Sequence, residues 1–256
     1  MILLKTAAEI EAMARAGHIL GQLLEAVAGR VTPGVSTAEL DDFAEEFIRS
    51  YQGATPAFKG LYGFPGTLCV SLNEEVVHGI PSPNRLLREG DIISIDAGVR
   101  LAGWYSDAAV TCPVGAVDPE SARLLDVTRQ ALDAGIVRAT SRGRLGDIGA
   151  AIQQVAESAG FSVVRDLVGH GLGRGPHEEP QVPNYGTAGK GLRLHEGMVI
   201  AIEPMVNVGG PDVRTLADRW TVVTADGSRS AHFEHSVAIT AAGPRVLTGA
   251  GAPVRS

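Results

Sequence analysis

Hydrophobic and polar positions first indicate where helices form. Apolar residues recur near helical spacing over residues 6–28, and Gly29 follows as a stop signal. Ser36 and Glu39 give a capping-box pattern, and Pro119 stands in the first turn of a later stretch. We predict helices over residues 6–28, 36–51, 118–139 and 147–159.

Short apolar and β-branched runs predict strands after each pair of helices. In the first half these runs lie at 67–72, 91–99 and 105–112. In the second half they lie at 161–164, 166–171, 191–194, 198–206, 219–224 and 232–240. Helices followed by strands, twice over, predict an α+β fold of two related halves. We expect a single domain over residues 1–256, with its core at 5–248 and a frayed tail at 249–256.

Four acidic residues lie inside or at the ends of these strand-like runs, where a lone carboxylate is unfavourable. Burying one unpaired carboxylate costs several kcal/mol or forces it to bind a proton. A shared cation would remove that cost for all of them. The Gly-rich segment 169–180 between the second and third acid adds His170 and His177. The four acids are Asp96, Asp107, Glu203 and Glu234.

The donor types narrow the choice of cation. Carboxylates with one or two imidazoles suit Mn, Fe, Co or Zn, and they fit two ions that share bridging carboxylates. Asp96 and Asp107 are 11 residues apart, a spacing that suits adjacent antiparallel strands. A calcium loop is disfavoured because the acids are scattered along the chain. Residues 169–180 also lack the Lys-Ser/Thr ending of a phosphate-binding loop.

Composition limits the partners. The chain has 22 Lys and Arg against 29 Asp and Glu, a net charge of −7 that disfavours nucleic acid and anionic membranes. No run approaches the 18 apolar residues of a membrane span, and the first residues lack a signal-peptide pattern. Cys69 and Cys112 form no disulfide framework. We therefore expect a cytoplasmic protein.

Five separated segments resemble those of the methionine aminopeptidases, in the same order and spacing over residues 5–248. They read VSLNEEVVHGIP, DIISIDAG with GWYSDAAVT, GHGLGRGPHEEPQVPNY, GMVIAIEPMV and FEHSVAIT. The resemblance implies the pita-bread metallopeptidase fold. It also implies removal of the N-terminal methionine from nascent proteins with a small second residue, by hydroxide held between two divalent ions.

The resemblance assigns the metal centre residue by residue. It implies that Asp96, Asp107, His170, Glu203 and Glu234 ligate the two ions, which are Co, Mn, Fe or Zn. Asp107 and Glu234 would bridge the ions. Glu203 would also carry a proton during the reaction.

Other residues receive roles around that centre. The resemblance implies that His177 hydrogen-bonds the scissile amide and that His78 contacts the substrate near its scissile nitrogen. Asn73 and Glu75, through their backbone carbonyls, and Ser230 match a Na or K site of some members.

The implied methionine pocket departs from the family pattern. Members often have an aromatic residue in place of Leu61 and Pro176, a smaller residue near Phe58, and Gln in place of His232. Cys69 is interpreted either as a soft wall against the methionine thioether or as simple core packing. The pocket residues are Phe58, Leu61, Phe64, Cys69, Pro176 and Trp220.

Alternatives within and outside the family differ in testable ways. Proline-directed peptidases of this fold carry a large N-terminal domain, and type II methionine aminopeptidases carry an insert between the last two ligand segments. Glu203 and Glu234 are only 31 residues apart, so the short bacterial type I form fits. A non-catalytic relative would lack ligands. A paralogue with narrower substrate specificity remains an alternative interpretation.

The resemblance further implies a monomer acting on nascent chains near the ribosome.

Overall fold

The computed structural model describes residues 2–249, and residues 250–256 of the predicted tail lie outside that range. All four predicted helices are confirmed. Capping boxes start the first two, with Thr6 paired to Glu9 and Ser36 paired to Glu39. Asp118 caps the third through the Ser121 N–H. The helices are α1 Ala7–Ala28, α2 Thr37–Arg49, α3 Pro119–Arg138 and α4 Leu145–Ser158.

The strands of the first half match the predicted runs and add two short ones. The elements are β1 Ala54–Pro56, the 3₁₀ turn η1 Leu61–Gly63, β2 Leu68–Leu72, β3 Glu75–Val77, β4 Ile92–Leu101 and β5 Trp104–Pro113. The strands of the second half are β6 Ser162–Val163, β7 Gly169–Gly171, β8 Glu178–Val182, β9 Val199–Ile202, β10 Met205–Asn207, β11 Val213–Thr215, β12 Val222–Thr224, β13 Ser230–His232, β14 Glu234–Thr240 and β15 Gly243–Val246.

One strand prediction in the second half is wrong. Residues 191–194 form no strand, because Gly191 and Gly197 at positive φ turn the backbone and only Arg193 makes an isolated bridge, to Arg144. Strands β8, β11 and β15 were not predicted, and β8 is the one that lies beside the Gly-rich segment. Charged residues and Pro180 in β8 hide the apolar pattern of a strand.

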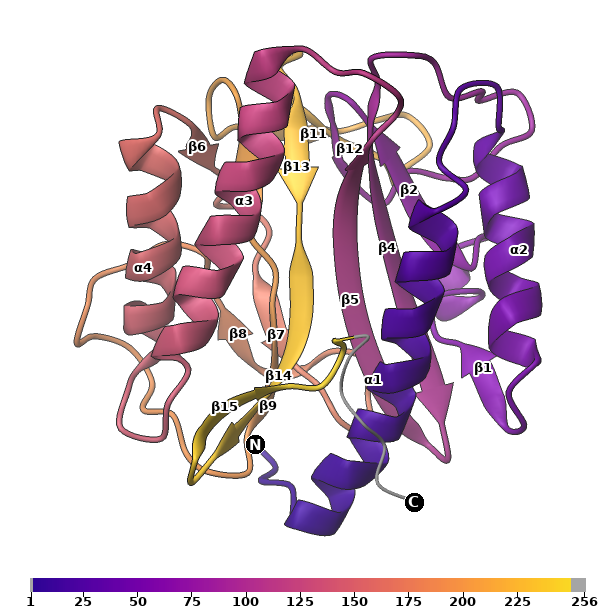
Figure 1. The fold of residues 1–256 in the computed structure, drawn as a ribbon. Coiled ribbons are helices and arrows are strands. Elements are labelled where there is room, and N and C mark those ends of the chain that lie inside the picture. The colour runs from indigo at the N-terminus through magenta and orange to yellow at the C-terminus, as the bar shows by residue number, and fades with distance from the viewer. Residues whose placement is uncertain (1, 250–256) are drawn as a thin grey trace.

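A nine-stranded sheet joins the two halves of the chain. Its order is β1-β4-β5-β14-β9-β7-β8, with β2 also pairing β4 and β15 also pairing β14. The halves meet where β5 pairs antiparallel with β14 (Figure 1). Residues more than a hundred positions apart are therefore hydrogen-bonded neighbours at the centre of the sheet.

The four helices lie on one face of this sheet (Figure 1). Helices α1 and α2 pack on Ile93, Ile95 and Ala97 of β4, and α3 and α4 pack on residues of β9 and β14 such as Ile202 and Val237. Successive side chains on a strand point to opposite faces. The residues between these apolar positions therefore project from the other face.

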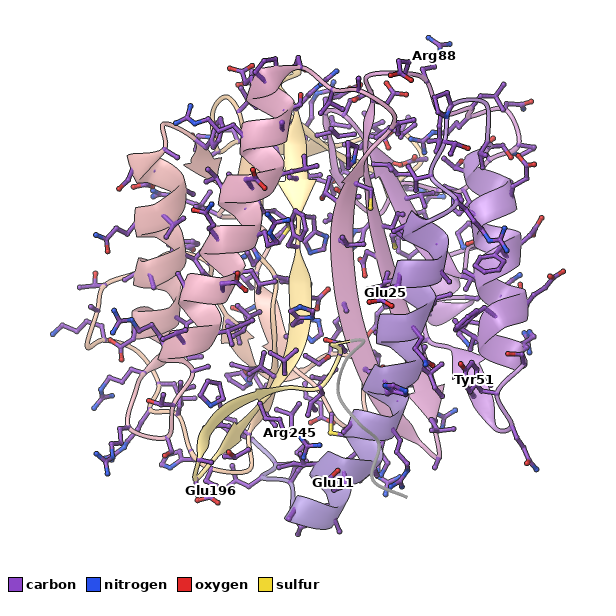
Figure 2. The ribbon with its side chains drawn as sticks, in the orientation of Figure 1. Glu11, Glu25, Tyr51, Arg88, Glu196 and Arg245 are labelled. Atoms are coloured by element: carbon purple, nitrogen blue, oxygen red, sulfur yellow. The ribbon has the colours of Figure 1, made fainter. Side chains whose placement is uncertain are left out.

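The outer surface carries charged side chains (Figure 2). Arg245 of β15 and Glu11 of α1 lie together there and form an ion pair that links the first helix to the last strand. Over residues 2–249, none of the helices has the length and apolar character needed to cross a membrane.

Candidate metal centre

The register of the central strands brings three acidic residues to one face of the sheet. Asp96 lies opposite Ala109 in the β4–β5 pair, and Ala109 lies opposite Glu234 in the β5–β14 pair. Asp107 precedes Ala109 by two residues, so it points to the same face. Asp96, Asp107 and Glu234 therefore converge opposite the helix-covered face.

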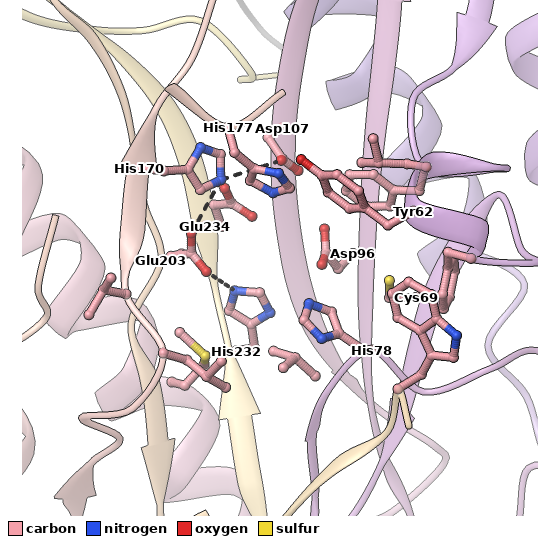
Figure 3. Close-up of a pocket in the computed structure, with 18 residues that line it drawn as sticks. Tyr62, Cys69, His78, Asp96, Asp107, His170, His177, Glu203, His232 and Glu234 are labelled. Carbon is pink, nitrogen blue, oxygen red and sulfur yellow. Dashed lines mark ion pairs between the residues drawn. The ribbon is translucent and has the colours of Figure 1, made fainter. Parts of the chain in front are cut away.

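Glu203 and His170 reach this cluster from the second half. Glu203 directly follows β9, and the antiparallel register of β9 with β14 places it beside Glu234. His170 is the middle residue of β7, which pairs with the other edge of β9. His170 Nε2 lies 3.5 Å from Glu203 Oε1 and 3.8 Å from Asp107 Oδ2 (Figure 3). Both halves of the chain thus supply the cluster.

Burial leaves these carboxylates without donors. Asp96 Oδ1, Asp107 Oδ1 and Glu234 Oε1 have no hydrogen-bond partner among residues 2–249. Desolvation raises the pKa of Asp96 to about 7. Desolvation, reinforced by repulsion from neighbouring carboxylates, raises the pKa of Asp107, Glu203 and Glu234 well above their ordinary values. The cluster is a set of orphaned acceptors that a cation would satisfy.

The donor geometry fits divalent metal. Burial lowers the pKa of His170 to about 4, so its imidazole is neutral and free to coordinate. Carboxylate oxygens with one neutral imidazole suit divalent first-row metals. We therefore identify the cluster as a divalent-metal site. Three overlapping groups have ligand atoms within 4.8 Å of one another: Asp96, Asp107 and Glu234; His170, Glu203 and Glu234; and Asp107, His170 and His177.

A cavity of about 300 Å³ opens beside the cluster. Its apolar side is built partly from Phe64 and Trp220, whose rings meet edge to face with centroids 5.1 Å apart. Cys69 lies opposite Asp96 in the β2–β4 register, which sets the apolar wall next to the carboxylates. The lining residues are Phe58, Leu61, Tyr62, Phe64, Cys69, Val77, His78, Asp96, Asp107, Leu167, Val168, His170, His177, Glu203, Met205, Trp220, His232 and Glu234.

Two rings stand at the mouth of the cavity. The Tyr62 and His177 rings are stacked, with centroids 6.1 Å apart and planes 17° apart. The His177 ring in turn meets the His170 ring edge to face at 4.5 Å. Tyr62 is 76% exposed and has a positive φ of 52°. An aromatic residue held in that conformation at a cavity mouth indicates a constrained, functional loop.

Two further histidines lie deeper. His78 follows β3 with φ 61°, and burial lowers its pKa. His232 ends β13, and burial lowers its pKa to about 3. Both rings line the cavity floor below Glu203 and Asp96 (Figure 3).

The cavity contains most of the predicted site residues. All five predicted metal ligands line it, together with His78, His177 and every predicted pocket residue except Pro176. Asn73, Glu75 and Ser230, which were predicted to hold Na or K, do not line the cavity. The Ser230 N–H donates to the Asn73 carbonyl at 2.8 Å, and the Glu75 carboxylate pairs with Arg85 at 2.5 Å.

Several lining residues were not predicted. His232 was noted as a departure from the family pattern but received no role. Met205 lies two residues after Glu203, a spacing that could have indicated a shared surface. Gly60 and Gly63 flank Tyr62 and mark a tight loop at the pocket. The other unpredicted residues are Val77, Leu167 and Val168, whose positions depend on tertiary packing.

Comparisons with known proteins agree with a metal site, because the family that they show is one of metallopeptidases. The model of the metallopeptidase family M24 matches residues 11–241. The chain belongs to this family, as the sequence segments predicted. Relatives and solved structures that match over nearly their full length are methionine aminopeptidases, which supports the predicted resemblance to the bacterial enzymes of that name.

The similarity extends over nearly the whole chain. Methionine aminopeptidase of Clostridium perfringens is 54% identical over 97% of this chain and 99% of its own length. Methionine aminopeptidase 1 of Bacillus subtilis is 52% identical over the same shares. The crystal structure of methionine aminopeptidase from Thermotoga maritima has a TM-score of 0.95 at 46% identity, covering 97% of this chain and all of that one.

A more distant structure shows the fold alone. Prolidase from Pyrococcus furiosus is 22% identical, with a TM-score of 0.76, and the match covers 96% of this chain and 65% of that one. The predicted pita-bread α+β fold is confirmed by these structures.

Proposed function

We propose that this chain removes the N-terminal methionine from polypeptides whose second residue is small, by metal-dependent hydrolysis. The observation that carries the proposal is the direct junction of the metal cluster with an apolar cavity. Cys69 of the cavity wall and Asp96 of the cluster are paired neighbours on β2 and β4. A bound methionine side chain therefore places its own amide beside the cluster.

The centre is proposed to hold two divalent ions. Asp107, His170 and Glu234 each belong to two of the donor groups. A carboxylate has two oxygens with which it could bridge two ions, whereas His170 Nδ1 contacts the Gly171 carbonyl and leaves only Nε2, so the arrangement supports Asp107 and Glu234 as bridging ligands. Asp96, His170 and Glu203 would complete the coordination. Mn, Fe, Co and Zn all accept this donor set.

When bound, such ions lower the pKa of a water molecule and polarise the scissile carbonyl. The side chains supply the rest. Glu203, which lines the cavity, accepts a proton and returns it to the leaving amine nitrogen. His177 donates a hydrogen bond to the oxygen of the scissile amide, and His78 contacts the substrate on the opposite side of the cavity.

The cavity supports recognition of methionine. Phe58, Phe64 and Trp220 offer aromatic surface, and thioethers contact aromatic rings favourably. Cys69 adds a soft wall, its thiol kept protonated because burial raises its pKa. Tyr62 and His177 crowd the mouth where the second residue would lie, which favours small side chains there.

Other roles complete the proposal. Asn73, Glu75 and Ser230 are proposed to hold Na or K, and the Ser230–Asn73 hydrogen bond supports their proximity. Residues 5–248 are proposed to act as one domain, supported by the sheet that joins both halves. The resemblance to the bacterial enzymes supports a cytoplasmic monomer that acts on nascent N-termini near the ribosome.

Peptide cleavage tests the function. With Mn²⁺ or Co²⁺, the protein should release methionine from Met-Gly and Met-Ala peptides and leave Met-Leu and Met-Lys peptides largely intact. N-acetylated Met-Ala peptide is the control, and it should resist cleavage because it lacks a free amine. If no Met-small peptide released methionine with either metal, the proposal would be refuted.

A further inference from the structure

His232 is a buried imidazole without hydrogen-bond partners. Its residue is 1% exposed, it lines the cavity, and neither ring nitrogen has a partner among residues 2–249. A buried polar group left unpaired costs roughly 1–3 kcal/mol. A polar side chain in that position is therefore expected to gain a partner when the site is occupied.

The backbone fixes where the ring points. His232 pairs with Met205 in the β13–β10 ladder. Its N–H donates to Thr111 Oγ1 at 2.8 Å, and its carbonyl accepts from the same hydroxyl at 2.8 Å. With the strand tied on both sides, the ring projects into the cavity beside Glu203 (Figure 3).

Glu203 is the group that His232 faces. His232 Nε2 lies 3.9 Å from Glu203 Oε2, while His170 Nε2 lies 3.5 Å from Glu203 Oε1. The carboxylate thus stands between two imidazoles, one facing each oxygen. A rotation of the Glu203 carboxylate could bring Oε2 within a hydrogen-bond distance of about 2.9 Å from His232 Nε2.

We propose that His232 is a positioning residue, whose Nε2–H donates to Glu203 Oε2 and holds this carboxylate in the orientation that binds the divalent ion. The His232 N–H keeps Glu203 Oε2 directed toward β13 and leaves Oε1 for the ion. Ligating carboxylates are commonly held by such outer hydrogen bonds, and losing one typically weakens metal binding about 10–100-fold. The inference rests on the proposed metal ligation by Glu203.

Metal affinity provides the test, independently of peptide cleavage. Mn²⁺ is titrated by calorimetry into the full-length protein after chelator stripping. His232→Leu should weaken Mn²⁺ binding about 10–100-fold. His232→Gln keeps an N–H donor of similar reach, so its affinity should stay within about threefold of wild type. His195→Gln, an exposed histidine away from the cavity, is the matched control and should leave binding unchanged.

Three results would overturn the proposal. Wild-type affinity in His232→Leu would show that the ring holds nothing in place. Equal weakening in His232→Gln and His232→Leu would show that the imidazole itself is a ligand. His232→Leu is also made in a Glu203→Gln background. If it weakened Mn²⁺ binding there by the same factor as in the wild type, His232 would not act through Glu203, because residues that act through one another have non-additive effects.

Two further controls separate the possible failures. His232→Met, which fills similar space without a donor, replaces His232→Leu if circular dichroism shows that the latter is unfolded. Methionine release by the wild type is measured in parallel. An inactive wild type in which His232→Leu still weakens Mn²⁺ binding would refute the proposed function and retain the positioning role.

Discussion

Single side chains in the cluster have opposite protonation tendencies that favour metal. Burial raises the pKa of Asp107 and Glu234, so without a cation they hold protons, whereas burial lowers the pKa of His170 and leaves it neutral. A divalent ion favours deprotonated carboxylates over protonated ones, and the neutral His170 imidazole is available to coordinate it. His177, in contrast, is exposed at the cavity mouth and belongs to only one of the donor groups.

His177→Ala should separate catalysis from metal binding. Loss of one donor to a developing oxyanion typically lowers kcat about 10²–10³-fold. We expect a loss of that size for Met-Ala peptide, with metal content, measured by elemental analysis, unchanged. His195→Ala serves as the surface control. A collapse in metal content would instead make His177 a ligand.

At the scale of elements, the segment before α1 braces the loop that presents His177. The Lys5 N–H donates to the Gly197 carbonyl at 2.7 Å, and Lys5 Nζ pairs with Glu178 at 2.8 Å. Glu178 also accepts the Gly175 N–H at 3.0 Å. The Lys5 and Glu178 side chains are only 6% and 17% exposed. The pair therefore connects the chain's first residues to β8 across the sheet edge.

Lys5→Met should destabilise the protein, because it leaves the Glu178 carboxylate buried without its partner. Breaking a buried ion pair costs on the order of 3 kcal/mol. The matched control is Arg129→Met, whose pair with Asp126 has side chains 58% and 60% exposed, and it should cost under about 1 kcal/mol. Urea unfolding measures both. Equal free energies of unfolding for the two variants would contradict this account of the brace.

The whole metal-free molecule should respond to pH through its carboxylate cluster. Unfolded carboxyls titrate near pH 4, whereas the folded site keeps protons to higher pH, with Asp96 at about 7. The folded state then binds more protons than the unfolded state, so stability falls as pH rises. Five histidines with lowered pKa values act oppositely, because unfolded histidines titrate near pH 6.5, and their effect fades above about pH 7.5. They are His78, His170, His177, His232 and His235.

Between pH 7.5 and 8.5, the melting temperature of chelator-treated protein should therefore fall. Saturating Mn²⁺ should raise the melting temperature, and by more at pH 8.5, because metal binding requires deprotonated carboxylates. Differential scanning calorimetry measures both trends. A metal-free melting temperature that rises over this interval would show that the cluster holds no excess protons.

Sequence alone located the metal centre because its residues follow local rules. Asp96 and Asp107 sit in long strands joined by a short turn, so their shared face follows from a period of two. Glu203 directly follows an apolar run and Glu234 precedes one, which made each conspicuous. The pairing of β5 with β14, which joins the two halves, is a long-range contact that no local pattern specifies.

The remaining features depend on tertiary context. Tyr62 reaches the cavity mouth through a turn in which Gly60, Tyr62 and Gly63 all have positive φ, and its stacking partner His177 comes from a distant loop. His232 shows its lack of partners only when the surrounding packing is known. The strand predicted at 191–194 was wrong because its apolar residues do not act together: Leu194 packs into the core, Leu192 is exposed, and only Arg193 makes an isolated bridge.

One titration tests the central claim that the carboxylate cluster binds divalent ions for methionine removal. Chelator-stripped wild type and Asp107→Asn receive Mn²⁺ in steps, and methionine release from Met-Ala peptide is measured at each step. Wild type should be inactive at first and gain activity as Mn²⁺ binds, while Asp107→Asn stays inactive at concentrations that saturate wild type. Release that persists without metal, or equal activity in Asp107→Asn, would contradict the account.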